Sequence, residues 1–73
     1  WEKAMLDAFQ DQVRRVENGQ STLIDPYGAT SHQEFFAEAI VTFFERPLAM
    51  RDQMPALYEQ LARLLALDPA QWD

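Results

Sequence analysis

The chain has 73 residues, of which 48% are hydrophobic and 25% are charged, and its formal net charge is −6 at pH 7. This length allows a single small domain, and the hydrophobic content excludes a disordered chain. The acidic balance argues against nucleic-acid binding, which needs a basic surface, and no apolar run approaches the ~20 residues of a membrane span.

The cysteine content bears on where the protein functions. Cysteine is absent, which excludes a disulfide framework and a thiolate metal site within these residues and is consistent with a cytoplasmic protein. The chain opens with Trp1 in amphipathic sequence, without the pattern of a secretory signal. Because this first residue is not methionine, we expect the chain to be a piece of a longer protein.

A first helix is predicted over residues 2–18. Its apolar side chains recur at steps of four and three and therefore line one face: Met5, Phe9, Val13 and Val16. Asn18 is followed by Gly19, which accepts the left-handed conformation that commonly ends a helix. The helix is thus expected to pack one face on a core.

The connection over residues 20–31 contains a tight turn. Asp25, Pro26 and Gly28 stand at the first, second and fourth positions, which matches the preferences of a type I turn. Tyr27 takes the third position. Its side chain is therefore predicted to project from a fixed backbone.

A second helix is predicted over residues 32–46, with Ser31 as its N-cap and Pro47 as its stop. Ser31 and Glu34 have the spacing of a capping box, in which each side chain satisfies the other residue's backbone donor. The helix carries a broad apolar band: Phe35, Phe36, Ala39, Ile40, Phe43 and Phe44. A helix this apolar is enclosed by other elements, so we expect it to be central.

The last third of the chain predicts a short helical turn over residues 48–51 and a helix over residues 55–67, ended by Asp68 and Pro69. The stripe of this last helix is predicted from four leucines: Leu57, Leu61, Leu64 and Leu65. Trp72 is expected to fold back on the apolar surface. No strand is predicted, so the fold class is all-α, with three to four helices in one unit over residues 1–73.

Candidate functional residues gather around the turn and the start of the second helix. Glu34 lies where the helix dipole favours a charged carboxylate, so it is either a zinc ligand or simply part of the capping box. Tyr27 either packs its ring on Phe35 or Phe36, or uses its hydroxyl to stabilise negative charge on a substrate oxygen. Glu38, one turn after Glu34, is either an exposed charge or a neighbour of the same site.

Other kinds of site find little support. The single histidine, His32, has no plausible nucleophile nearby, so a catalytic serine–histidine pair is not expected. We expect it to be a solvated residue of the first helical turn, with metal binding as the lesser alternative. The only glycines are Gly19 and Gly28, so no glycine-rich phosphate loop exists.

One long segment, DPYGATSHQEFFAEAIVTFFERP, resembles the C-terminal signature of the Mlc titration factor A family, also called glucose-regulated metallopeptidases. The resemblance continues through PALYEQLARLLALDP, which is similar to the closing helix of the family. The run from Tyr27 to Glu38 is also similar to the catalytic domain of anthrax lethal factor. The resemblance implies the C-terminal helical part of a gluzincin-like zinc metallopeptidase domain.

In these families zinc is held by two histidines of a His-Glu-x-x-His helix and by a later glutamate. The resemblance implies that Glu34 is this third ligand and that Tyr27 is the active-site tyrosine, which stabilises the oxyanion of peptide hydrolysis. Glu38 matches lethal factor, whereas many family members carry a glutamate near the position of Val41 and Thr42. The supporting role of Glu38 is therefore the least specific of the three.

The decisive departure is that no His-Glu-x-x-His occurs in the sequence. We therefore expect the isolated chain to bind zinc weakly and to be inactive, with zinc and a peptide substrate belonging to the full-length protein. The alternative hypothesis is a non-catalytic helical module that binds a partner, such as the transcriptional repressor Mlc that the family resemblance implies. Phenylalanines of the central helix, if exposed, would also cause the isolated chain to self-associate.

Overall fold

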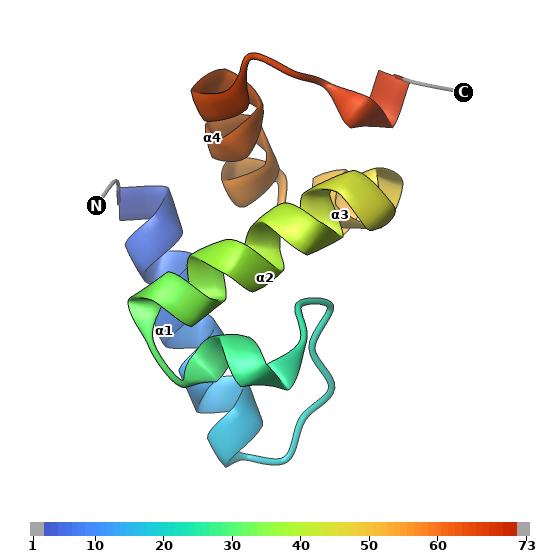
Figure 1. Ribbon diagram of the computed structural model, residues 1–73. Helices are drawn as coiled ribbons and strands as arrows, with labels where there is room; N and C mark the ends of the chain where they lie inside the picture. The colour runs from blue at the N-terminus through green and yellow to red at the C-terminus, as the bar shows by residue number, and fades with distance from the viewer. Residues whose placement is uncertain (1–2, 72–73) are drawn as a thin grey trace.

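A computed structural model describes residues 3–71 of the chain. The described residues form four α-helices and two 3-10 helices: α1 (Lys3–Glu17), η1 (Pro26–Ala29), α2 (His32–Glu45), α3 (Pro47–Gln53), α4 (Pro55–Leu65) and η2 (Pro69–Gln71). This part of the chain contains no strand, which confirms the all-α prediction. Helix α2 crosses the middle of the molecule, with α1 and η1 towards one end and α4 and η2 towards the other (Figure 1).

Helix α1 ends as its sequence predicts. Gly19 adopts a φ of 69°, and its N–H donates to the carbonyl of Val16 at 3.1 Å. The N–H of Gln20 donates to the carbonyl of Arg15 at 2.8 Å. These paired bonds form a Schellman motif, in which glycine avoids the steric cost of a β-carbon. The chain thereby leaves α1 in a fixed direction and enters the loop that leads to η1.

Helix α2 is central, as its apolar band predicts. Phe35 and Phe43 are fully buried in the core of this chain, so these two residues do not supply an exposed surface for self-association. Phe36 is partly buried against the core, whereas Phe44 is 43% exposed. The reason is that other elements of the same chain cover these rings: Phe35 contacts Phe9 of α1 and Gly28 of η1, and Phe43 contacts Tyr58 of α4.

The two helices after α2 each begin with a proline, at Pro47 and Pro55. Proline suits a first helical position because the N–H it lacks would have no partner there. Helix α3 is longer than the predicted turn over residues 48–51. Helix α4 ends at Leu65, two residues before the predicted end, because Ala66 adopts a left-handed φ of 55°. Trp72 lies outside the described residues.

The buried face of α4 differs from the leucine stripe in the sequence. Leu57 and Leu61 are buried, as the stripe predicts, but Leu64 is 57% exposed. Tyr58 is buried instead, with its ring centroid 5.1 Å from that of Phe43. A leucine stripe does not by itself identify the buried face when an aromatic residue lies at the adjacent position.

Tyr58 also links α4 to the end of the described chain. Its hydroxyl donates a hydrogen bond to the carboxylate of Asp68 and accepts one from the N–H of Ala70 at 2.9 Å. Burial raises the pKa of Tyr58, and the neighbouring Asp68 raises it further. The phenol therefore holds η2 against the core as a neutral group.

A single hydrophobic core unites these elements. Its buried members come from the loop before η1 and from the four α-helices: Met5, Ile24, Phe35, Ala39, Phe43, Met50, Leu57, Tyr58 and Leu61. Within residues 3–71, no helix combines the length and apolar character needed to cross a bilayer. The core thus fixes α1, η1 and α2 relative to one another, and these elements carry the candidate site.

Candidate functional site

The turn that carries Tyr27 is held by its own backbone and side chains. The N–H of Gly28 donates to the carbonyl of Asp25 at 2.8 Å, which is the hydrogen bond expected of the predicted turn. The Asp25 carboxylate accepts from the N–H of Tyr27 at 2.9 Å. Thr30 continues the structure, since its hydroxyl donates to the carbonyl of Tyr27 at 2.9 Å. The turn is therefore extended into η1, with Tyr27 inside it.

Close packing places η1 against the start of α2. A β-carbon added to Gly28 would lie 3.3 Å from Cγ2 of Ile24 and 3.4 Å from Cα of Phe35. Only a glycine allows this approach without a small displacement of its neighbours. Tyr27 immediately precedes Gly28, and Glu34 immediately precedes Phe35. The closest contact between the two elements thus lies one residue away from both candidate groups.

The Tyr27 side chain projects into solvent, with 59% of the residue exposed. Within the described part of the chain, its ring makes no aromatic contact with Phe35 or Phe36. Its hydroxyl forms no hydrogen bond to another described residue. This phenol is therefore available to donate to a ligand.

Glu34 occupies the first turn of α2 and is partly buried. Its N–H donates to the hydroxyl of Ser31 at 3.1 Å, so the N-cap forms as predicted. The reciprocal bond is absent: among residues 3–71, the Glu34 carboxylate makes no hydrogen bond or ion pair. The cap thus uses the backbone of Glu34 and leaves its carboxylate uncommitted beside the positive end of the helix dipole.

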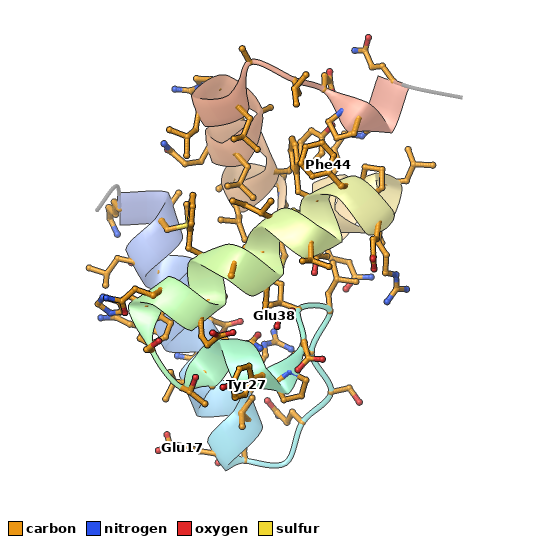
Figure 2. All side chains as sticks on the ribbon, in the orientation of Figure 1. Glu17, Tyr27, Glu38 and Phe44 are labelled. Carbon is orange, nitrogen blue, oxygen red and sulfur yellow. The ribbon has the colours of Figure 1, made fainter. Side chains whose placement is uncertain are left out.

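Glu38 and His32 lie on different sides of α2. Glu38 is half-buried, and Figure 2 shows it on the side of the helix that faces η1 and Tyr27. His32 packs its ring edge-on against Phe9 of α1, with the ring centroids 4.4 Å apart. Residues two positions apart point to nearly opposite sides of a helix, so His32 is directed away from the side of Glu34. The solvated placement expected for His32 is therefore only partly correct, because the residue is exposed but contacts Phe9.

The described residues do not form a complete metal site. No group of three or more histidine, cysteine, aspartate or glutamate side chains within residues 3–71 is arranged to hold an ion. A zinc site takes four ligands, and Glu34 offers one uncommitted carboxylate. The donor set of this chain is consistent with one contributor to a metal site that other residues would complete.

One residue of the site region, Gln12, was missed in the sequence. It is only 3% exposed, and its side-chain nitrogen donates to the carbonyls of Ile24 and Asp25, both at 3.0 Å. The signal was present: Gln12 lies seven residues after Met5 and three after Phe9, on the apolar face of α1. A polar residue on such a face requires a hydrogen-bonding partner once it is buried.

The chain was compared with protein-family models, with curated proteins and with solved structures. The family model of the glucose-regulated metallopeptidases M90 matches residues 1–65, which include Tyr27, Glu34 and Glu38. A protein of Synechocystis sp. (strain ATCC 27184 / PCC 6803 / Kazusa), described as "Uncharacterized protein slr2042", is 36% identical over 69 residues. The aligned region covers 94% of this chain and 25% of the relative, so the chain spans about a quarter of that relative's length. No solved structure matches the chain.

The family match covers nearly all of the described elements, from α1 to the end of α4. It also includes the capped start of α2 and the turn before it, where the uncommitted side chains of Glu34 and Tyr27 lie. The chain therefore belongs to the glucose-regulated metallopeptidase M90 family, the family of Mlc titration factor A.

Proposed function

We propose that this chain is the C-terminal helical part of a zinc-dependent peptidase, in which Glu34 is one metal ligand and Tyr27 stabilises the transition state. The observation that carries the proposal is the uncommitted carboxylate of Glu34 at the capped start of α2, next to η1. Among the described residues, every buried side-chain oxygen and nitrogen has a hydrogen-bond partner, so the unpartnered oxygens of Glu34 are open to solvent. They are therefore accessible to a cation supplied by the full-length protein.

The remaining ligands must come from residues outside this sequence. The chain holds a single histidine, His32, which points away from Glu34 and contacts Phe9. The family resemblance implies that two histidines of a His-Glu-x-x-His helix complete the site. The full-length protein is therefore expected to place such a helix beside the first turn of α2.

Zinc, when bound in such a site, lowers the pKa of a coordinated water to about 7 and so provides a nucleophile at neutral pH. The residues of this chain would then act on the charge that develops. Glu34 supplies an oxygen ligand from the first turn of α2. Tyr27 donates its hydroxyl to the oxyanion of the peptide carbonyl, a contact worth roughly 3 kcal/mol in comparable sites.

Glu38 is assigned a supporting role. Its side chain lies one turn after Glu34 on the side of α2 that faces Tyr27 (Figure 2). A second carboxylate there adds negative charge beside the cation. Such a group orients a ligand or a bound water by accepting its hydrogen bond. Loss of Glu38 is therefore expected to weaken activity less than loss of Glu34.

The full-length protein allows a direct test with Glu34→Gln. This variant keeps the shape of the side chain but removes its charge, and Glu45→Gln on the same helix is the control because Glu45 is exposed. We expect Glu34→Gln to lose most bound zinc and to lower peptide hydrolysis by a factor of about 100 or more, whereas Glu45→Gln retains both.

The same variant separates the peptidase from a non-catalytic partner-binding module. Retention of zinc and hydrolysis in Glu34→Gln would contradict the proposed role of this residue. Loss of binding to a transcriptional repressor in that variant, with zinc content unchanged, would favour the interaction module. Zinc content measured by elemental analysis and repressor binding measured by calorimetry distinguish these outcomes.

A further inference from the structure

We propose that Gln12 is a positioning residue for Tyr27, and that helix α1 therefore belongs to the site rather than to the scaffold alone. Gln12 is buried, and its amide nitrogen contacts the carbonyl oxygens of Ile24 and Asp25. The inference rests on the proposed function only in assigning a catalytic purpose to Tyr27. The structural part of the proposal can be measured without any peptidase activity.

The hydrogen bonds of Gln12 enter the turn at its first residue. The carbonyl of Asp25 accepts from the Gln12 side chain at 3.0 Å and from the N–H of Gly28 at 2.8 Å. The carboxylate of the same Asp25 accepts from the N–H of Tyr27 at 2.9 Å. One residue thus connects the side chain of α1 to the backbone on both sides of Tyr27. Displacing Asp25 would displace Tyr27 with it.

No comparable tie to a helix side chain exists elsewhere in the described part of this segment. The other side-chain bonds of residues 20–27 are local, such as that of the Thr22 hydroxyl to the carbonyl of Ile24 at 2.6 Å. They shape the loop but do not tie it to α1. The amide of Gln12 therefore orients the loop against α1 together with the packing of the fully buried Ile24.

Packing between α1 and the loop is incomplete next to this amide. A hollow of about 300 Å³ lies there, and its lining comes from α1, the loop and the α3–α4 junction: Asp11, Gln12, Arg15, Ser21, Thr22, Leu23, Gln53 and Met54. Close packing resists displacement of a segment, and a hollow weakens that resistance locally. The hydrogen bonds of Gln12 therefore add to the core packing of Ile24 at this point.

The first test measures the turn itself in the 73-residue chain. Gln12→Met keeps the length of the side chain and removes the donor, and Gln10→Met on the exposed side of α1 is the matched control. The chain has two glycines, so glycine-selective labelling yields one amide signal for Gly28 and one for Gly19. Gly28 reports on the turn, and Gly19 reports on the end of α1.

We expect Gln12→Met to accelerate amide hydrogen exchange at Gly28 about tenfold and to leave Gly19 within about twofold of the wild type. Gln10→Met is expected to change neither signal. Unchanged exchange at Gly28 in Gln12→Met would overturn the proposal. Equal acceleration of both glycines would also overturn it, because Gln12 would then only support global stability.

The second test uses hydrolysis by the full-length protein. If Gln12 acts through Tyr27, Gln12→Met lowers kcat about tenfold with KM unchanged, because the phenol contacts only the transition state. In a Tyr27→Phe background the same substitution should lower kcat no further. Independent, multiplicative effects of the two substitutions would contradict a shared action.

The two tests separate this inference from the proposed function. A full-length protein that hydrolyses no peptide and binds no zinc would end the peptidase proposal, while amide exchange at Gly28 would still decide the role of Gln12. Active protein with normal exchange at Gly28 in Gln12→Met would end the positioning role and leave the peptidase proposal standing.

Discussion

Gly28 packs its backbone directly onto Phe35: a β-carbon at position 28 would lie 3.4 Å from Cα and 3.5 Å from Cδ1 of Phe35. This contact sets the distance between η1 and α2. The small separation leaves room for one methyl group after a slight adjustment, but not for a branched side chain.

Substitutions at Gly28 should therefore have effects that depend strongly on size. Gly28→Ala is expected to lower the free energy of unfolding by less than about 1 kcal/mol, and Gly28→Val by roughly 1–3 kcal/mol, because a branched side chain overpacks the contact. Urea denaturation measures both. Equal stability of Gly28→Val and wild type would show that η1 can move away from α2 without cost.

The start of α2 contains the N-cap Ser31, whose expected role is structural, and Glu34, whose proposed role is functional. Ser31→Ala removes the acceptor of the Glu34 N–H and should cost about 1 kcal/mol of stability. Glu34→Gln should lower the free energy of unfolding by at most a few tenths of a kcal/mol. The reason is that, among the described residues, the charge of Glu34 interacts only with the dipole of α2. Thermal denaturation of the two variants compares them. A larger loss in Glu34→Gln than in Ser31→Ala would reveal a structural partner for the carboxylate.

Leu61 and Leu64 provide a matched pair on α4. Leu61 is fully buried and Leu64 is 57% exposed. Leu61→Ala is expected to lower the free energy of unfolding by about 2–5 kcal/mol, enough to unfold a chain of this size, whereas Leu64→Ala should change it by less than about 0.5 kcal/mol. Far-UV circular dichroism during denaturation tests this. Similar losses in both variants would mean that Leu64 is covered in solution.

Tyr58 should make stability depend on pH in the alkaline range. Its pKa is raised above the ordinary value of 10.0 by burial, so the folded state favours the protonated phenol. Protonated tyrosine therefore contributes its full stabilisation below pH 10, and the contribution is lost as pH rises through the higher pKa of the folded state. Tyr58→Phe should be less stable than the wild type at pH 7. As the pH rises above 10, however, the variant should lose less stability than the wild type.

The exposed Tyr27 supplies the control for this measurement. Tyr27→Phe should retain the alkaline loss of stability seen in the wild type, since it leaves Tyr58 in place. Urea denaturation at pH 7 and above pH 10 measures the difference. An identical alkaline loss in Tyr58→Phe and wild type would assign the pH dependence to other groups.

Self-association of the isolated chain stays a prediction, but the structure changes the residues responsible. Phe35 and Phe43 are buried, whereas Val41 is 46% and Leu48 is 59% exposed. Replacing Val41 and Leu48 together by serine should shift a dimer towards monomer, because apolar surface is lost without affecting the core. Multi-angle light scattering at high concentration detects the change. A monomeric wild-type chain under those conditions would contradict the prediction.

Local signals in the sequence were sufficient for the turn, for the start of α2 and for the end of α1. The Asp25 turn, the Ser31 cap and the Gly19 stop each depend on side chains within a few residues, so their chemistry can be read directly. The end of α4 was missed because Ala66 rarely adopts the left-handed conformation. Ala66 is exposed, and the bend is closed by the N–H of Leu67, which donates to the carbonyl of Ala62 at 3.1 Å.

Contacts between residues that lie far apart in the sequence could not be predicted from such local signals. The periodicity of α1 showed an apolar face but not that Gln12 would be buried on it against Ile24 and Asp25. The leucine stripe of α4 concealed the burial of Tyr58. In each case the outcome depends on which element packs opposite, and that is decided by the whole fold. The roles proposed for Tyr27 and Glu34 came from the resemblance, and the structure adds that, within residues 3–71, their functional groups form no hydrogen bond or ion pair with another residue.

The Tyr58 hydroxyl has a consequence for where this folded unit can be cut. The family match ends at residue 65, but the hydroxyl depends on Asp68 and Ala70 beyond that limit. Truncation at the end of the matched region would leave a buried phenol with neither acceptor nor donor, a loss of about 1–3 kcal/mol. A recombinant domain boundary should therefore be drawn after Gln71 rather than at Leu65.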